Sequence, residues 1–178
     1  PEAQEAQNAY KMLSIRVWKD FAAAMGAYGR ADLQARYNGY AEAKMAALRN
    51  NSAWHSDFGL HALAEVAASG LLNSAEQKAI VEKEFLDRVN RLSLDPFCQL
   101  FILQAMARMN RYDDAFSSIR DLWGGVIRLG GTAPWECYRP SWNSGIGATD
   151  PVPNTQSGIT SLCHPWGAGP VKWLNEEV

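Results

Sequence analysis

Apolar side chains recur at steps of three and four residues along most of the chain, which is the period of an amphipathic helix. This pattern predicts seven helical segments, at about 5–25, 33–49, 58–69, 74–92, 95–106, 112–126 and 165–176. No stretch of the sequence alternates with the two-residue period of a strand. The sequence therefore predicts an all-α fold.

The predicted segments are of two kinds, and the two kinds alternate. The first, third and fifth are apolar on nearly every face, whereas the second, fourth and sixth carry one apolar stripe. This alternation is typical of concentric layers of helical hairpins, with inner helices covered on both sides. We expect residues 1–178 to be a single all-α segment of an (α/α) toroid, about half of a six-hairpin (α/α)6 barrel. An open helical solenoid is the alternative, but the sequence shows no fixed repeat.

Three local signals set the expected ends of helices. Gly70 follows the third segment, and glycine commonly ends a helix in the left-handed conformation. The run Ser74-Ala75-Glu76-Gln77 predicts a capping box at the start of the fourth segment. Asp95 followed by Pro96 predicts an N-cap for the fifth segment, and Asp57 is likewise expected to cap a helix.

Composition and charge narrow the class of partner. The chain has 178 residues, 47% of them hydrophobic, and a formal net charge of -2. A nucleic-acid or anionic-membrane surface needs clustered Lys and Arg, so this balance argues against both. No apolar run has the length of a membrane span, and no metal-ligand spacing or phosphate loop is present in the sequence. We expect a neutral partner and no cofactor.

The three cysteines form neither a disulfide framework nor a zinc pattern, because no two of them are closely spaced. Cys98 lies in an apolar run and is expected in the core. Cys137 and Cys163 lie in two stretches that we expect to meet, so a bond between them is one alternative.

The chemistry is predicted at one rim of the toroid. If inner and outer helices alternate antiparallel, every inner helix begins at the same rim, and the connections that lead into inner helices converge there. These connections are residues 50–57, 92–96 and 130–160. The last is about thirty residues long, and such loops usually carry function or disorder. The aromatic and polar residues near this rim are Trp54, His55, Asp57, Asp95, Trp135, Glu136, Tyr138, Trp142 and His164.

Two of these stretches carry a more specific pattern. One is Thr132-Ala133-Pro134-Trp135-Glu136, and the other is Ser161-Leu162-Cys163-His164-Pro165-Trp166-Gly167-Ala168-Gly169-Pro170. Together with the runs Asp95-Pro96-Phe97-Cys98-Gln99-Leu100-Phe101 and Asp121-Leu122-Trp123-Gly124-Gly125, they resemble the catalytic domain of bacterial α-L-rhamnosidases, glycoside hydrolase family 78. The resemblance covers roughly residues 54–178, and the paired stretches are more specific than either alone.

The resemblance implies an (α/α)6 barrel that hydrolyses terminal α-L-rhamnosides with inversion. Glu136 matches the family's general base in its Trp-Glu motif. The general acid belongs to an earlier part of the barrel, and no segment here matches it. The chain is therefore expected to be the C-terminal part of the catalytic barrel, with the rest of that barrel as its partner. The resemblance leaves the periplasm, secretion and the bacterial cytoplasm open.

Several side chains are expected to bind the sugar. The methyl group and C–H face of a deoxyhexose suit the rings of Trp54, Trp135 or Trp166, and Tyr138 is assigned to the same wall. His164 can bond ring hydroxyls. Two alternatives stay open: a non-catalytic helical-hairpin module that binds carbohydrate or protein, and an (α/α)6 enzyme acting on another sugar.

Overall fold

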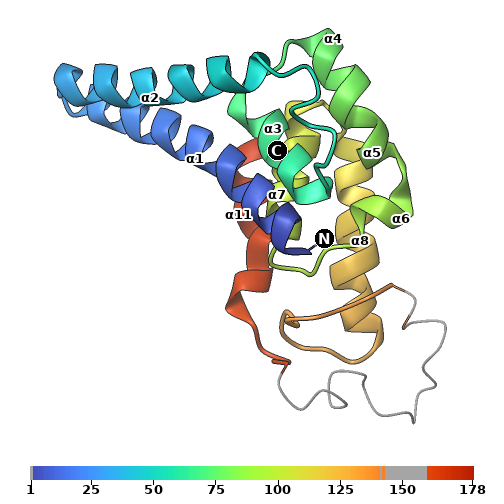
Figure 1. Cartoon of the computed structure of the whole chain (residues 1–178). Helices are drawn as coiled ribbons and strands as arrows, with labels where there is room; N and C mark the ends of the chain where they lie inside the picture. Colours follow the sequence, from blue (N-terminus) through green and yellow to red (C-terminus); the bar gives the residue numbers. More distant parts are fainter. Residues whose placement is uncertain (1, 141, 143–159) are drawn as a thin grey trace. The chain divides into compact units, whose positions relative to one another are not determined.

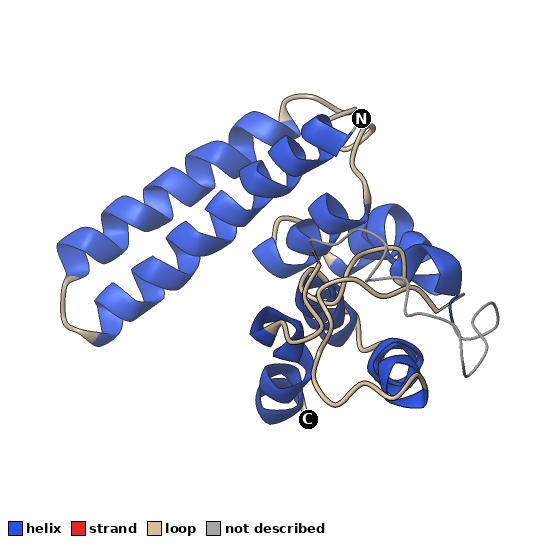
Figure 2. Cartoon of the chain, turned by 90° about the horizontal axis from the view of Figure 1, so that it is seen from below, coloured by secondary structure: helices blue, strands red, loops and turns tan. Residues whose placement is uncertain are grey.

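The computed structural model describes residues 2–140, 142 and 160–178. Every regular element within them is helical, as Figure 2 shows, and none of these residues forms a strand. The all-α prediction is confirmed. The contacts divide the chain into two compact units, residues 1–81 and 82–178. Among the described residues, no helix has the length and apolar character needed to cross a membrane.

The first unit begins with a long hairpin of α1 (Glu2–Ala27) and α2 (Ala31–Arg49), seen in blue and cyan in Figure 1. Aromatic rings join the two helices, and the Phe21 and Tyr37 centroids lie 4.6 Å apart. The sequence predicted α1 to be covered on most sides, but Tyr10 and Val17 are 73% and 52% exposed. That prediction is wrong because α1 packs through one side only.

Helix α3 (Leu60–Ser69) is buried along most of its length, as its apolar composition predicted. It packs against α1, where the guanidinium of Arg16 lies 3.5 Å from the fully buried carboxylate of Glu65. The helix ends at Gly70, whose φ of 70° is the left-handed conformation expected there.

The predicted fourth helix is broken into four short pieces. They are α4 (Ser74–Gln77), a π-helical turn η1 (Lys78–Glu82), α5 (Lys83–Leu86) and α6 (Arg88–Arg91). The capping box is present one residue earlier than predicted, with Asn73 as N-cap and Glu76 as its partner. Asp87 interrupts the expected apolar stripe, because its side chain accepts the backbone N–H groups of Val89 and Asn90.

In the second unit, α7 (Gln99–Arg108) packs against α8 (Tyr112–Arg128) and α11 (Gly169–Glu177). A short 3-10 helix, η2 (Pro165–Ala168), leads into α11. The buried Trp173 joins α11 to α7, since its indole N–H donates to the carbonyl of Leu103 at 2.8 Å. Helix α7 is buried on most faces and α8 on one, as predicted.

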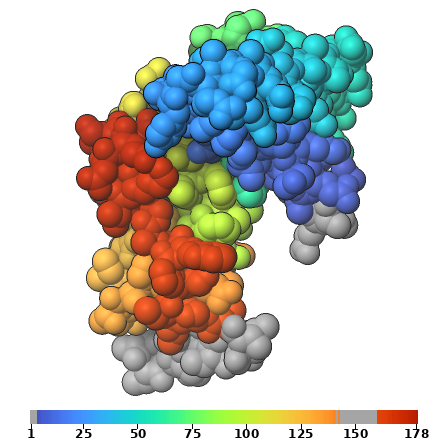
Figure 3. Space-filling model, turned by 90° about the vertical axis from the view of Figure 1, so that its left-hand side faces the viewer, coloured from blue at the N-terminus to red at the C-terminus, as the bar shows by residue number. Residues whose placement is uncertain are grey.

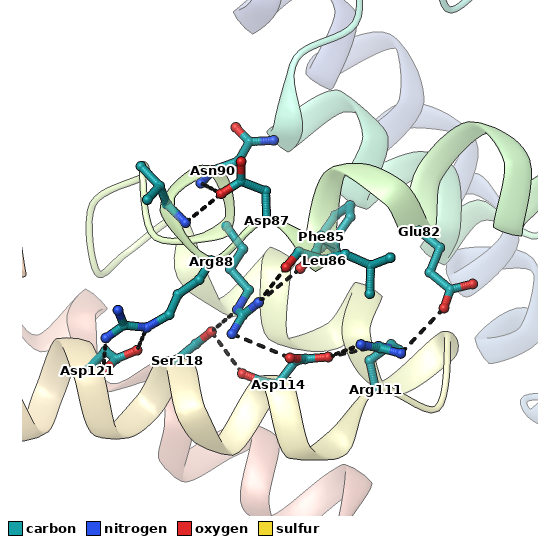
Figure 4. Close-up of polar contacts among 12 residues, drawn as sticks. Glu82, Phe85, Leu86, Asp87, Arg88, Asn90, Arg111, Asp114, Ser118 and Asp121 are labelled. Atoms are coloured by element: carbon teal, nitrogen blue, oxygen red, sulfur yellow. Dashed lines mark hydrogen bonds and ion pairs between the residues drawn. The ribbon is translucent and has the colours of Figure 1, made fainter.

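The buried guanidinium of Arg91 fixes the broken segment against α8, and Figure 4 shows its labelled partners. Its Nη1 donates to the carbonyls of Phe85 and Leu86 at 3.3 and 3.2 Å. Its Nε donates to Ser118 Oγ at 3.2 Å, and Nη2 lies 3.4 Å from Asp114 Oδ1. These bonds satisfy carbonyls that an irregular helix leaves open.

Candidate active site

Two connections of the second unit meet at Gly167, in η2: the one before α7 and the one between α8 and η2. A Cβ added there would lie 3.0 Å from Pro134 Cβ, 3.4 Å from the carbonyl oxygen of Trp135 and 3.5 Å from Pro96 Cβ. The Gly167 carbonyl also accepts the indole N–H of Trp123, on α8, at 2.6 Å. The connection before α7 therefore meets the Trp-Glu loop, as the sequence predicted for residues 92–96 and 130–160. The third connection of that prediction, residues 50–57, belongs to the first unit.

The Trp-Glu loop and the segment before η2 are held by a group of bonds that we name the clamp, comprising residues 134–136 and 161–164. The Glu136 N–H donates to the Ser161 carbonyl at 2.9 Å, and the Ser161 N–H donates to Glu136 Oε2 at 2.7 Å. The His164 N–H donates to the Pro134 carbonyl at 2.8 Å. Figure 3 shows these orange and red-orange segments side by side. The two motif stretches are thus in direct contact.

Glu136 is half-buried, and its two oxygens have different surroundings. Oε2 accepts the Ser161 N–H, which fixes the carboxylate in place. Within the described part of the chain, Oε1 has no hydrogen-bond partner. One oxygen therefore holds the loop, and the other is left to accept a proton from a bound molecule.

The rings of Trp135 and Tyr138, close to Glu136 in the sequence, anchor the loop in the core. Trp135 is 3% exposed and Tyr138 is fully buried, and both pack into a core with Leu122 and Val126 of α8. The sequence assigned both rings to the substrate wall. The structure instead places them in the core, where they have almost no surface left for stacking on a sugar.

Asp95 has a different role from the one predicted. It pairs with Arg139 of the Trp-Glu loop, whereas α7 begins at Gln99 with Cys98 in the capping position. The prediction that the Asp95 side chain caps this helix is therefore wrong. The ion pair adds a second tie between the connection before α7 and the loop that carries Glu136.

The cysteines are all free, so the Cys137–Cys163 bond that the sequence left open is not formed. Burial raises the pKa of the Cys98 thiol, and the negative charge of Asp95 raises it further. The pKa of the Cys137 thiol is raised by the same two causes, and the charge of Glu136 adds to them. Neither thiol has the lowered pKa of a nucleophilic cysteine.

Two predicted residues have surface for a ligand. The Trp166 side chain is 68% exposed, and its ring centroid lies 5.7 Å from that of His164. His164 is half-buried, and its Nδ1 is enclosed without a hydrogen-bond partner among the described residues. His164 belongs to the clamp, and Trp166 follows two residues later in η2, so both lie on the segment that the clamp joins to Glu136.

Trp54 belongs to the first unit. Its ring packs against His55 and Phe58, with centroids at 5.0 and 5.5 Å. Asp57, expected to cap α3, is replaced in that role by Glu5 of α1, whose carboxylate accepts the N–H groups of Gly59 and Ala62 at 2.6 and 3.0 Å.

Of the predicted site residues, Glu136, His164 and Trp166 make up the candidate site in the second unit.

Sequence reasoning missed two residues at this site, Phe97 and Arg139. Phe97 fell within the fifth predicted helix, which the sequence made apolar on nearly every face, yet the residue is 40% exposed and its ring lies against Trp166. Its position directly after Asp95-Pro96 was the available signal, because that turn belongs to the converging connections.

In the part of the chain that the structure describes, no group of His, Cys, Asp and Glu can hold a metal ion.

Comparison with known proteins adds no relative: the chain matches no protein-family model, no curated protein and no solved structure. A fixed carboxylate with one oxygen available can accept a proton from a hydroxyl or from water. The exposed indole of Trp166, on the segment that the clamp joins to Glu136, offers an apolar face.

Proposed function

We propose that this chain is part of an inverting glycoside hydrolase that removes terminal α-L-rhamnose from glycosides or polysaccharides, with Glu136 as the general base. The observation that carries the proposal is the clamp, because it holds Glu136 by one oxygen and leaves the other available. It also joins the two stretches on which the rhamnosidase resemblance depends.

The chemistry follows from the requirements of inversion. One carboxylic acid protonates the leaving oxygen while a carboxylate on the opposite face of the sugar removes a proton from water, about 6.5–9.5 Å away. Glu136 takes the second role. His164 orients a sugar hydroxyl, and Trp166 covers an apolar face of the ring. As the resemblance implies, the general acid lies outside residues 1–178, in the same (α/α)6 barrel.

A non-catalytic carbohydrate-binding module is the second candidate, and one observation favours it. The Ser161 N–H on Glu136 Oε2 is the kind of bond by which a carboxylate holds a loop together without taking part in any reaction. The two candidates predict the same binding of sugar but a different outcome when the charge of Glu136 is removed.

Glu136→Gln separates them, because glutamine keeps an acceptor for the Ser161 N–H and loses only the basic oxygen. The test uses a polypeptide in which residues 1–178 are joined to the barrel segment that carries the general acid. Hydrolysis of an aryl α-L-rhamnoside by this polypeptide is followed by NMR. We expect a fall in kcat of about 10²–10⁴-fold, the usual contribution of a general base. Glu42→Gln, an exposed residue of α2, is the matched control and should keep full activity.

Inversion requires the β anomer of rhamnose as the first product. Near wild-type turnover by Glu136→Gln would refute the base assignment and favour the binding module. An initial α anomer would refute inversion while leaving hydrolysis in place. We also expect residues 1–178 alone to be inactive, and rhamnoside cleavage by them would overturn the assignment of the acid to another segment.

A further inference from the structure

The second unit has a cavity of about 360 Å³ that none of the candidate site residues lines. It lies between α6, with the turn that follows this helix, and the end of the Trp-Glu loop. Its described lining residues are Arg88, Val89, Leu92, Ser93, Arg139 and Pro140. Sites for small molecules have volumes of about 300–1,000 Å³ and apolar walls with a few polar groups. This cavity has that size and that composition.

The apolar side of the cavity results from the break in the predicted fourth helix. Asp87 caps a new turn there, and Val89 beyond it lines the cavity while it is 80% exposed. Leu92 lines the cavity from the core. Between these two residues, the buried Arg91 bonds to α5 and α8 and so holds the segment in place. The apolar side is therefore formed before any ligand binds.

Arg139 lines the cavity with only one nitrogen of its guanidinium in use. This nitrogen, Nη1, donates to Asp95 and, at 3.1 Å, to the Tyr138 carbonyl. Among the described residues, Nε and Nη2 have no hydrogen-bond partner. Adjacent N–H groups of a guanidinium can bind a carboxylate through two parallel bonds. The ion pair with Asp95 therefore positions Arg139 and leaves this binding edge available.

Arg88 supplies a second fixed cation to the same cavity. Its Nε and Nη2 donate to the two oxygens of Asp121 at 2.8 and 2.6 Å, as Figure 4 shows. Within the described part of the chain, its Nη1 has no partner. Of the residues that the structure describes, no carboxylate lines the cavity, so Asp95 and Asp121 pair with the two arginines from outside it. The lining thus carries positive groups alone, which favours an anion.

We infer that this cavity binds a small organic carboxylate with an apolar body. Arg139 and Arg88 hold the carboxylate, and Val89 and Leu92 pack against the apolar part. A neutral molecule would cover the available N–H groups without replacing their bonds to water, and an inorganic anion would leave the apolar side uncovered. The cavity shares no lining residue with the candidate active site, so this binding is a property beyond the proposed function.

Three probes separate charge from apolar contact. Phenylacetate and phenylacetamide have the same shape and differ in charge, whereas acetate keeps the charge and lacks the ring. Each is titrated into isotopically labelled residues 1–178, and backbone amide shifts are followed by NMR. We expect phenylacetate to shift the Val89 and Ser93 amides, with a Kd about tenfold lower than that of either other probe. Equal Kd values for phenylacetate and phenylacetamide, or for phenylacetate and acetate, would overturn the inference.

Two substitutions of Val89 test the charge of the cavity directly. Val89→Asp places a carboxylate there, and Val89→Asn is its uncharged match in shape. Because Val89 is 80% exposed, neither change should prevent folding. We expect Val89→Asp to raise the Kd for phenylacetate at least about tenfold and Val89→Asn only about threefold, since like charges repel. Equal Kd values for the two variants would contradict the assignment of an anion.

Arg139→Gln should raise the Kd for phenylacetate about tenfold, because it removes the charged binding edge. Arg36→Gln removes the same charge from an exposed position of α2, and it should leave the Kd unchanged. Circular dichroism identifies a variant that fails to fold, and the two Val89 variants then decide. Phenylacetate shifts that are absent from Val89 and Ser93 and appear at Trp166 would place the binding elsewhere and overturn the inference.

Discussion

Glu5 and Glu136 are both half-buried carboxylates that accept backbone N–H groups from a remote part of the sequence, but they use their oxygens differently. Glu5 commits both oxygens to the start of α3, at Gly59 and Ala62. Glu136 commits one oxygen, to Ser161. A carboxylate with both oxygens bonded to backbone can only hold structure. One with a single oxygen bonded is positioned and still able to react.

The comparison is sharpened most by Glu136→Asp. Aspartate keeps the charge but is shorter by one methylene, so it cannot both accept the Ser161 N–H and keep the second oxygen in place. We expect a loss of about hundredfold in kcat for an aryl α-L-rhamnoside, as misplacing a catalytic group by about 1 Å commonly gives. Activity within twofold of wild type would show that the position of this oxygen does not matter.

The next effect is on stability, and it uses the same substitution at both sites. Glu5→Gln replaces one of the two acceptor oxygens by an NH₂ group, which is a donor. One backbone N–H group at the start of α3 then faces a second donor and loses its hydrogen bond. We expect it to lower the free energy of unfolding by about 1–2 kcal/mol. Glu136→Gln keeps its single acceptor and should change it by less than about 0.5 kcal/mol.

Urea unfolding followed by circular dichroism measures both, with Glu42→Gln as the control for an exposed carboxylate. Equal losses for Glu5→Gln and Glu136→Gln would remove the distinction drawn between them.

A third carboxylate, Glu65, is buried beside the guanidinium of Arg16 and not beside backbone N–H groups. Burial raises its pKa, and the nearby charge of Arg16 opposes the rise only in part. A raised folded-state pKa gives stability that is full below the unfolded value and is lost as the pH rises through the folded value. The wild type should therefore lose stability relative to Glu65→Gln as the pH rises above 4.5.

The urea midpoints of the wild type and of Glu65→Gln, measured as the pH is raised from 4.5, give the difference in stability between the two proteins. A difference that stays constant with pH, or that changes in the opposite direction, would contradict the raised pKa.

The smallest effect is expected at Asp95. Its ion pair with Arg139 is partly exposed, so Asp95→Asn should cost less than about 1 kcal/mol. Because the charge of Asp95 raises the pKa of the Cys137 thiol, the variant should alkylate faster at Cys137. Iodoacetamide labelling measures this, with the exposed Cys163 as the internal reference. An unchanged rate at Cys137 would argue against that influence.

The sequence predicted the helical fold and the buried character of α3 and α7, because residues apolar on every face leave no side for solvent. It failed between residues 74 and 92. Val81 and Phe85 are buried as expected, but Val89 is 80% exposed. Helical spacing alone could not reveal that Asp87 would cap a new turn and rotate the chain beyond it.

At the site, sequence reasoning predicted that Glu136 and His164 come from stretches that meet, and the clamp confirms that contact. It did not predict the burial of Trp135 and Tyr138. A ring in a loop of glycines and prolines serves equally well as an anchor or as a ligand wall. Trp135 and Tyr138 are anchors because they pack against apolar residues of α8. This packing joins residues that are distant in the sequence, so the local pattern does not predict it.

The hydrogen bond from Ser161 to Glu136 also makes the candidate base visible without a substrate. The Ser161 amide proton points at Oε2 from 2.7 Å between its nitrogen and that oxygen, so its chemical shift responds directly to the charge on the carboxylate. This one backbone resonance therefore reports on the state of the Glu136 carboxylate. The bond that fixes the carboxylate is thus also a spectroscopic probe, already part of the backbone, of its readiness to act as a base.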